Sequence, residues 1–276
     1  GAADWRSTLE VRAKLVDFAI ESGLEGVAST LPVPFAKTAH ETVPVRIERR
    51  VDDAARDSIR VTWGKTMTAS IARRREGQEL VVESAAVGLG EEEMPVTAGP
   101  GIWLKGTLPA LDVDRWRAFL ANGPMAGAGS IGLASVELKV ETLDLFSRRF
   151  NEVRVSARQT DQWRMRVSAR ELGGEIGWQP QDKGRVVARL KRLALPPPTE
   201  PAAEPSNTPR AQADRYPALD VVVDDFSYKD RSLGRLTLSA IPEGRHWRIQ
   251  HLGLRKGGAT LTARRQDRLR PRQDGG

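Results

Sequence analysis

The chain has 276 residues, of which 39% are hydrophobic and 29% charged, and it carries a formal net charge of +7. This apolar content excludes a wholly disordered chain, and the length suits one large domain or two modest ones. The sequence has no cysteine, which excludes disulfides and thiolate chemistry, and it offers only three histidines to a metal. No run approaches the roughly 18 apolar residues of a membrane span. Acidic residues are interspersed with the basic ones, which argues against a nucleic-acid-binding patch.

Alternation of apolar and polar residues with a period of two dominates the chain and predicts half-buried β-strands. Such runs cover residues 43–48, 59–63, 136–141, 153–157, 163–169, 186–190, 219–224 and 236–240. Turn signals rich in glycine separate the runs at intervals of about 10–15 residues, which is typical of an antiparallel meander. A further run begins at Trp247 and Ile249, and its phase slips near Gln250 and His251, which predicts a β-bulge.

One short helix is predicted near 112–121. Asp112 can cap its N-terminus, Val113, Trp116 and Leu120 fall on one face, and an Asn-Gly pair ends it. A single short helix cannot cover the apolar faces of so many strands, so the strands must bury these faces in another way. A second sheet packed face to face, a closed barrel or a curled trough would each serve, and the sequence pattern by itself favours the sandwich or barrel.

Prolines are concentrated in residues 196–217, which hold seven of the 17 prolines of the chain. Because proline cannot donate to a β-ladder, the segment is predicted to be a loop within one continuous sheet or a linker at a domain boundary. The predicted organisation is therefore a β-segment over 1–195, a Pro-rich loop or linker over 196–216 and a continuation of the β-segment over 217–263. Residues 264–276, which break the alternation, are expected to form a disordered tail.

A search for catalytic motifs favours a protein that is not an enzyme. Adjacent carboxylates such as Asp52 and Asp53 point to opposite faces of a strand, so they do not form an acid–base pair. The Gly-Leu-Gly sequence at 88–90 lacks the rest of a dinucleotide fingerprint, and Ser130 does not lie in a nucleophile elbow. We therefore predict no catalytic residue, no metal and no cofactor.

The clearest pair of predicted strands, 153–157 and 163–169, would have one apolar and one cationic side. Val153 and Val155 alternate with Arg154, and Trp163, Met165 and Val167 alternate with further arginines. If the sheet curls with its apolar side inward, these side chains would contact a hydrophobic ligand. The candidate residues for such contacts are Val136, Leu138, Val153, Val155, Trp163, Met165 and Val167.

An ordered set of segments resembles the AsmA-like envelope proteins of the YhdP type. The sequences LEGVASTLPVPFAK at 24–37, GTLPALDVDRW at 106–116 and LGGEIGW at 172–178 carry the resemblance. Further matching segments follow in the expected order, at 190–196, 217–220, 233–236 and 247–252. The resemblance covers about residues 5–263, and the sequence departs from the family pattern from residue 264 onward.

The resemblance implies a segment of a very long cell-envelope protein of Gram-negative bacteria. Such a protein is anchored in the inner membrane by an N-terminal segment outside this chain, and its body crosses the periplasm as a curled β-sheet with an open hydrophobic groove. The groove would conduct phospholipid between the inner and outer membranes, with acyl chains inside it, and would support outer-membrane biogenesis and the permeability barrier. The family offers no catalytic motif to carry over.

Two function hypotheses follow. The first is a lipid transport segment with a β-groove, bound to phospholipid and connected to membranes through terminal regions outside this chain. The second is a periplasmic β-sandwich with a closed core that serves as an interaction or carbohydrate-binding module. The two differ in whether the apolar faces of the strands pack against one another or line an open channel.

Overall fold

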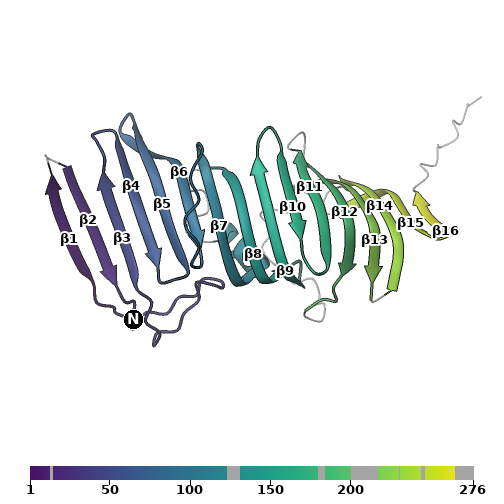
Figure 1. Cartoon of the computed structure of the whole chain (residues 1–276), viewed down its shortest axis with the longest axis horizontal. Coiled ribbons are helices and arrows are strands. Elements are labelled where there is room, and N and C mark those ends of the chain that lie inside the picture. The colour runs from purple at the N-terminus through teal and green to yellow at the C-terminus, as the bar shows by residue number, and fades with distance from the viewer. Residues whose placement is uncertain are drawn as a thin grey trace, which may run out of the picture. The chain divides into compact units, whose positions relative to one another are not determined.

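The computed structural model describes residues 1–12, 15–122, 131–179, 184–199, 217–229, 231–243 and 246–264. In these residues the chain is 69% strand and 4% helix, so the prediction of an all-β fold with one short helix is confirmed. The described residues form sixteen strands, which are numbered in the order of the chain (Figure 1). In the part of the chain that is described, no helix is both long enough and apolar enough to cross a membrane.

The contacts divide the chain into two compact units. Unit 1 comprises residues 1–161, 165–170 and 197–201, and unit 2 comprises 162–164, 171–196 and 202–276. The predicted division at the Pro-rich segment stays a prediction, because residues 200–216 lie outside the described residues. Residues 265–276, almost all of the predicted tail, also lie outside them.

Unit 1 holds the first nine strands, the helix and most of the tenth strand. Its elements are β1 (Arg6–Arg12), β2 (Leu15–Ser22), β3 (Val45–Val51), β4 (Arg56–Trp63), β5 (Met67–Glu76), β6 (Glu79–Leu89), β7 (Gly101–Asp112), α1 (Val113–Asn122), β8 (Leu133–Leu145), β9 (Arg148–Gln159) and β10 (Trp163–Ser168). Unit 2 begins with the first residues of β10. It continues with β11 (Leu172–Gln179), β12 (Arg185–Leu195), β13 (Ala218–Tyr228), β14 (Arg231–Glu243), β15 (His246–Lys256) and β16 (Ala259–Arg264).

The strands of unit 1 have an apolar and a polar side because successive side chains leave a strand on opposite faces. The register keeps this phase from strand to strand, since Ile47 lies opposite Val61 and Val61 lies opposite Ala69. The apolar face of unit 1 includes Ile20, Ile47, Ile59, Val61, Ile71, Val87, Leu104, Leu138 and Val155. The polar face of unit 1 includes Arg46, Glu48, Arg60, Ser70, Lys105 and Lys139.

Three pairings depart from the predicted antiparallel meander: β6 with β7, β7 with β8 and β12 with β13 are parallel. Parallel neighbours need a crossover connection, and each of the three pairs has one. Residues 90–100 cross on the polar face of unit 1, where Thr107 Oγ1 donates to Glu92 Oε1 at 2.7 Å. Helix α1 lies in the second crossover, and the Pro-rich segment joins β12 to β13.

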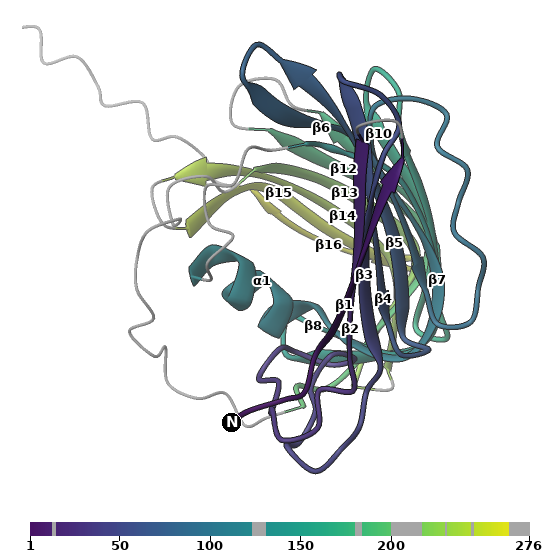
Figure 2. The same ribbon diagram turned by 90° about the vertical axis from the view of Figure 1, so that its left-hand side faces the viewer.

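Helix α1 begins where the sequence predicts it. The backbone N–H of Arg115 donates to Asp112 Oδ1 at 2.8 Å, which is the expected N-cap. The buried side of the helix differs from the prediction, because Trp116 and Phe119 contact each other edge to face while Leu120 is 51% exposed. Figure 2 shows α1 lying on one side of the sheet of unit 1, beside β8.

An aromatic cluster, formed by Phe35, Trp63, Trp116 and Phe119, joins α1 to the apolar face of unit 1. Phe35 contacts the rings of Trp63 on β4 and Trp116 on α1, with centroid distances of 6.1 and 5.8 Å. Trp116 Nε1 also donates to the carbonyl oxygen of Val33 at 2.9 Å. Because Trp63 shares the apolar phase of β4, the cluster places the start of α1 at that end of the apolar face.

A buried lysine fixes the long loop that carries Phe35. Lys37 donates from Nζ to the carbonyl oxygens of Leu24 at 2.7 Å and Thr38 at 3.0 Å, and also to that of Val27. An ammonium group has three donors, and here each finds an acceptor, which offsets the loss of hydration on burial. Lys37 therefore organises residues 23–44 between β2 and β3 and orients Phe35 toward α1.

Unit 2 repeats the two-sided pattern around a small core. Ala188, Leu190 and Val223 are buried, and Ile176, Leu193, Val221, Phe226 and Leu236 pack against them. The predicted bulge near Gln250 is confirmed, because Ser239 pairs with His251 whereas Ala240 pairs with Ile249. The extra residue returns Leu252 and Leu254 to the apolar phase, opposite Leu238 and Leu236.

Candidate functional site

Four of the seven predicted contact residues lie together on β8 and β9. Leu138 pairs with Val155, Val136 pairs with Ala157, and Val153 pairs with Val140. All of these side chains share the apolar face of unit 1, because antiparallel partners point to the same side. The structure therefore brings Val136, Leu138, Val153 and Val155 into one patch.

The other three predicted residues lie on β10. Met165 and Val167 belong to unit 1 and occupy alternate positions of the strand, in the phase that is shielded from solvent. Trp163 is half-buried and belongs to unit 2. Met165 and Val167 therefore lie in unit 1, on the strand that follows β9, whereas Trp163 of the same strand belongs to unit 2.

Burial separates the candidates into two groups. Val136, Val153 and Val167 are buried, so they pack against their protein neighbours. Leu138, Val155 and Met165 are half-buried and still offer apolar surface. The residues best placed to contact a ligand are therefore the second group.

Protein atoms cover the apolar faces of the two units less completely than they would in a β-sandwich. Within each described unit the strands pair edge to edge in a single order, and no second sheet lies on top of them. In a β-sandwich, side chains from two inner faces would interdigitate and most would be fully buried. Here Leu108, Val140, Val153 and Val223 are among the side chains buried almost completely, whereas others in the apolar phase, such as Ile59, Val61 and Leu138, are only half-buried. Within the described residues of either unit, the closed core that the sequence pattern favoured is not formed.

Two groups of residues, one at each end of the strands, bound the apolar face of unit 1. On β4 the face runs from Asp57 at one end to Trp63 of the aromatic cluster at the other, with Ile59 and Val61 between them. Six residues of extended chain span about 20 Å. The apolar face is therefore about 20 Å wide, measured along β4.

A charged cluster of Arg49, Asp57 and Arg73 forms the first of these boundaries. Arg73 binds Asp57 with two hydrogen bonds, from Nε to Oδ1 at 2.8 Å and from Nη2 to Oδ2 at 2.7 Å. Arg49 Nε adds a third, to Oδ2 at 2.7 Å. The Asp57 side chain is only 2% exposed, whereas Arg49 and Arg73 are 31% and 22% exposed. Burial by itself raises the pKa of Asp57, but the hydrogen bonds from Arg73 and Arg49 outweigh it, so the pKa lies below its ordinary value.

Sequence reasoning missed this charged cluster, although a signal for it was present. Arg49 follows Val45 and Ile47 in the apolar phase of β3, and Arg73 follows Ala69 and Ile71 in that of β5. A charge in the apolar phase is unusual because an unpaired buried charge is costly. Its partner is a residue of another strand, and only the register shows which one.

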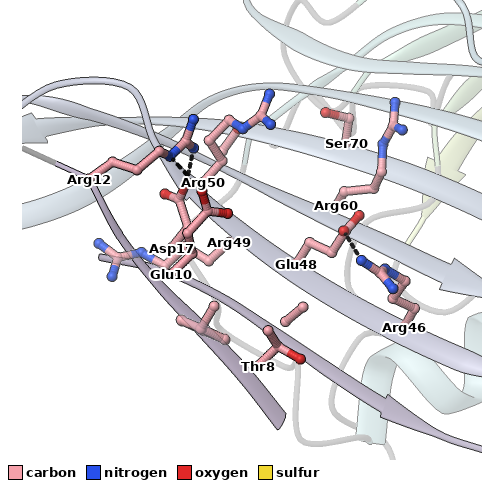
Figure 3. Close-up of a pocket in the computed structure, with 13 residues that line it drawn as sticks. Thr8, Glu10, Arg12, Asp17, Arg46, Glu48, Arg49, Arg50, Arg60 and Ser70 are labelled. Carbon is pink, nitrogen blue, oxygen red and sulfur yellow. Dashed lines mark hydrogen bonds and ion pairs between the residues drawn. The ribbon is translucent and has the colours of Figure 1, made fainter. Parts of the chain in front are cut away.

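A depression on the polar face of unit 1 has a different character. It has a volume of about 560 Å³ and spans β1 to β5, and Figure 3 shows its arginine and carboxylate side chains. Arg46 Nη2 binds Glu48 Oε1 at 2.5 Å, and Arg12 binds Asp17. The hydrogen bond from Arg46 lowers the pKa of Glu48, and the charges of Arg60 and Arg50 add to this effect. The depression is therefore lined by a network of ion pairs.

The part of the chain that the structure describes holds no candidate metal site. Among these residues, no three carboxylates or histidines come together in a way that could hold a metal ion. The predicted absence of a cofactor and of catalysis stays a prediction.

Comparisons with known proteins give one match. A family model described as YhdP protein matches residues 1–274, which is nearly the whole chain. Searches of curated proteins and of solved structures find no significant match. The resemblance noted from the ordered sequence segments is confirmed by this match.

Proposed function

The chain belongs to the YhdP protein family, and from this premise we propose that it is a lipid-conducting, non-catalytic segment of a bridge-like transport protein of the cell envelope. In this proposal phospholipid moves along the apolar faces between the inner and outer membranes and supports the outer-membrane permeability barrier. The segment would lie in the periplasm, and a membrane anchor would precede it outside this chain. The observation that supports the proposal best is a long run of strands whose apolar faces are only partly covered.

The energetics of lipid transfer favour such a surface. Moving an acyl chain from a bilayer into water costs about 0.8 kcal/mol for each CH₂ group, so a lipid cannot cross the aqueous periplasm unassisted. Half-buried aliphatic side chains replace much of the lost apolar contact. Leu138, Val155 and Met165 offer such contacts while the backbone keeps its hydrogen bonds in the sheet.

A photocrosslinking experiment in envelopes tests this proposal. A photoreactive residue at Val155 should form adducts with phospholipid, whereas the same residue at Ser156 should not, because Ser156 lies on the opposite side of β9. The two positions are adjacent, so chain location, expression and crosslinker chemistry are matched. Lipid adducts at both positions in equal yield, or at neither, would contradict the lipid-conducting assignment.

A pair of substitutions tests the same patch functionally. Val155→Glu should interrupt lipid transport, because a carboxylate breaks the apolar track, yet the half-buried position lets the charge stay hydrated. Ser156→Glu should leave transport unchanged. We choose Val155 over Val167 because Val167 is 7% exposed, so a carboxylate there would be buried and would unfold the sheet. Normal transport by the Val155→Glu protein with a normal melt would argue for a binding module that conducts no lipid.

A further inference from the structure

The charged cluster brings positive charge into a face that is otherwise apolar. Arg49, Asp57 and Arg73 share the phase of Ile59 and Ile71, and two guanidinium groups share one carboxylate. The cluster therefore carries a net charge of one positive unit. Charge beside apolar side chains is costly unless an opposite charge compensates it.

The hydrogen bonds of the charged cluster leave donors free for a ligand. Arg73 engages both oxygens of Asp57, whereas Arg49 uses only its Nε. In the described residues, the two terminal amino groups of Arg49 make no hydrogen bond to protein. A guanidinium with free terminal N–H groups matches the geometry of phosphate oxygens.

A recess of about 240 Å³ has Arg49 in its lining. Its lining combines cationic and apolar side chains: Arg49, Arg56 and Arg75 lie in it with Val16, Val51 and Leu80. Asp53 and Asp57 also line the recess. The positive charges outnumber the negative ones, so the recess suits a singly charged anion that is attached to an apolar body.

We propose that this recess, with Arg49 as its principal donor, binds the phosphate of a phospholipid headgroup at one end of the apolar face of unit 1. The inference rests on the proposed function, since it assigns the headgroup of the same ligand. The acyl chains would run from the recess over Ile59, Val61 and Ile71 toward the aromatic cluster. That distance of about 20 Å accommodates an acyl chain that spans one leaflet, because the hydrocarbon core of a bilayer is about 30 Å thick and contains two leaflets.

The test compares two neighbouring arginines that lie on opposite sides of β3. Arg49→Gln removes the free donors but leaves Asp57 with both hydrogen bonds from Arg73, so the sheet keeps its ion pair. Arg50→Gln removes an equal charge from the polar face; both arginines line the other depression, but only Arg49 also lines the recess. Binding of dioleoylphosphatidylglycerol and of dioleoylglycerol to the full chain in a neutral detergent is measured by native mass spectrometry.

We expect Arg49→Gln to weaken phosphatidylglycerol binding about tenfold, which is the usual effect of losing a charged hydrogen bond. Dioleoylglycerol binding should not change, because that lipid has no phosphate, and Arg50→Gln should not change the binding of either lipid. Arg75→Gln, at an exposed position of the recess, is a second variant with the same expected direction should Arg49→Gln fold poorly. Equal phosphatidylglycerol affinity in wild type, Arg49→Gln and Arg75→Gln would overturn the phosphate site.

Two further outcomes separate this inference from the proposed function. If the wild-type chain binds neither lipid, the lipid-conducting function itself fails. If all proteins bind both lipids equally well, the function stands and the phosphate site alone fails. Glycerol 3-phosphate distinguishes a headgroup from free phosphate: binding as tight as that of phosphatidylglycerol would show a site for soluble phosphate and overturn the lipid assignment.

Discussion

Asp57 shows how a carboxylate is held on an apolar face. Its side chain is almost inaccessible, and three hydrogen bonds from Arg49 and Arg73 replace the water that burial removes. The arginines extend toward solvent and keep part of their hydration, so the arrangement avoids the full cost of a sealed ion pair. Asp57 therefore links β3, β4 and β5 at the end of the apolar band.

Substitution of Asp57 should show this role through its pH dependence. We expect Asp57→Asn to lower the free energy of unfolding by about 1–3 kcal/mol at pH 7, because the arginines lose their charged acceptor. The folded-state pKa of Asp57 is lowered, so its contribution is present above the unfolded pKa of about 3.9 and is lost as the pH falls through the folded value. The difference between wild type and variant should therefore shrink below about pH 4.

Urea unfolding followed by tryptophan fluorescence measures this difference at each pH. Asp52→Asn, at an exposed position of the adjacent turn, controls for general loss of a carboxylate and should have little effect. A stability difference between wild type and Asp57→Asn that stays constant down to pH 3 would show that the ion pair is not its source.

At the scale of elements, α1 is attached mainly through its first turns. Trp116 supplies the hydrogen bond to Val33 and two aromatic contacts, whereas Leu120 near the C-terminal end is half exposed. The loop fixed by Lys37 carries Phe35 against the same tryptophan. The position of the helix therefore depends on a loop that lies far away in the sequence.

Removal of the indole should loosen the helix but leave the sheet intact. Trp116→Leu keeps an apolar side chain but loses one hydrogen bond and the ring contacts, which together contribute about 1–2 kcal/mol. We expect amide exchange in α1 and in residues 23–44 to become about tenfold faster, while β3 to β5 exchange as before. Leu120→Ala, at an exposed position of the same helix, should leave exchange unchanged. Equal acceleration in both variants would contradict attachment through Trp116.

At the scale of the whole molecule, stability is built up strand by strand. In the described residues most strands make their extensive contacts with the strands before and after them, and α1 adds contacts with β8. Proteins assembled this way behave like one-dimensional arrays, in which a local defect affects its neighbours first. A partly covered apolar face adds to this behaviour because little of the core is shared between distant strands.

Local unfolding should follow the order of the strands. Leu108→Ala, at a position only 2% exposed on β7, should cost about 2–5 kcal/mol through the lost side chain and the cavity left behind. Hydrogen exchange should accelerate in β7 and β8 and remain unchanged in β2 and β3 of the same unit. Leu9→Ala, at an exposed position of β1, is the matched control with little expected effect. Uniform acceleration across unit 1 would show a single cooperative core instead.

The sequence by itself determined the features that depend on local period and on local caps. Alternation identified the apolar phase of Val136, Leu138, Val153 and Val155, because strand geometry sends alternate side chains to opposite faces in any sheet. A break in that phase located the bulge at Gln250, and the Asp112 cap located α1. Each of these signals lies within a few residues of the structure it predicts.

The tertiary structure decided what depends on the neighbours of a strand. Alternation is the same in parallel and antiparallel strands, so the crossovers around β7 and β13 could not be recognised from it. The partners of Asp57 come from two other strands, and only register brings Arg49 and Arg73 to it. Whether an apolar face is sealed or left partly open also depends on what packs against it, because the same alternating pattern suits both cases.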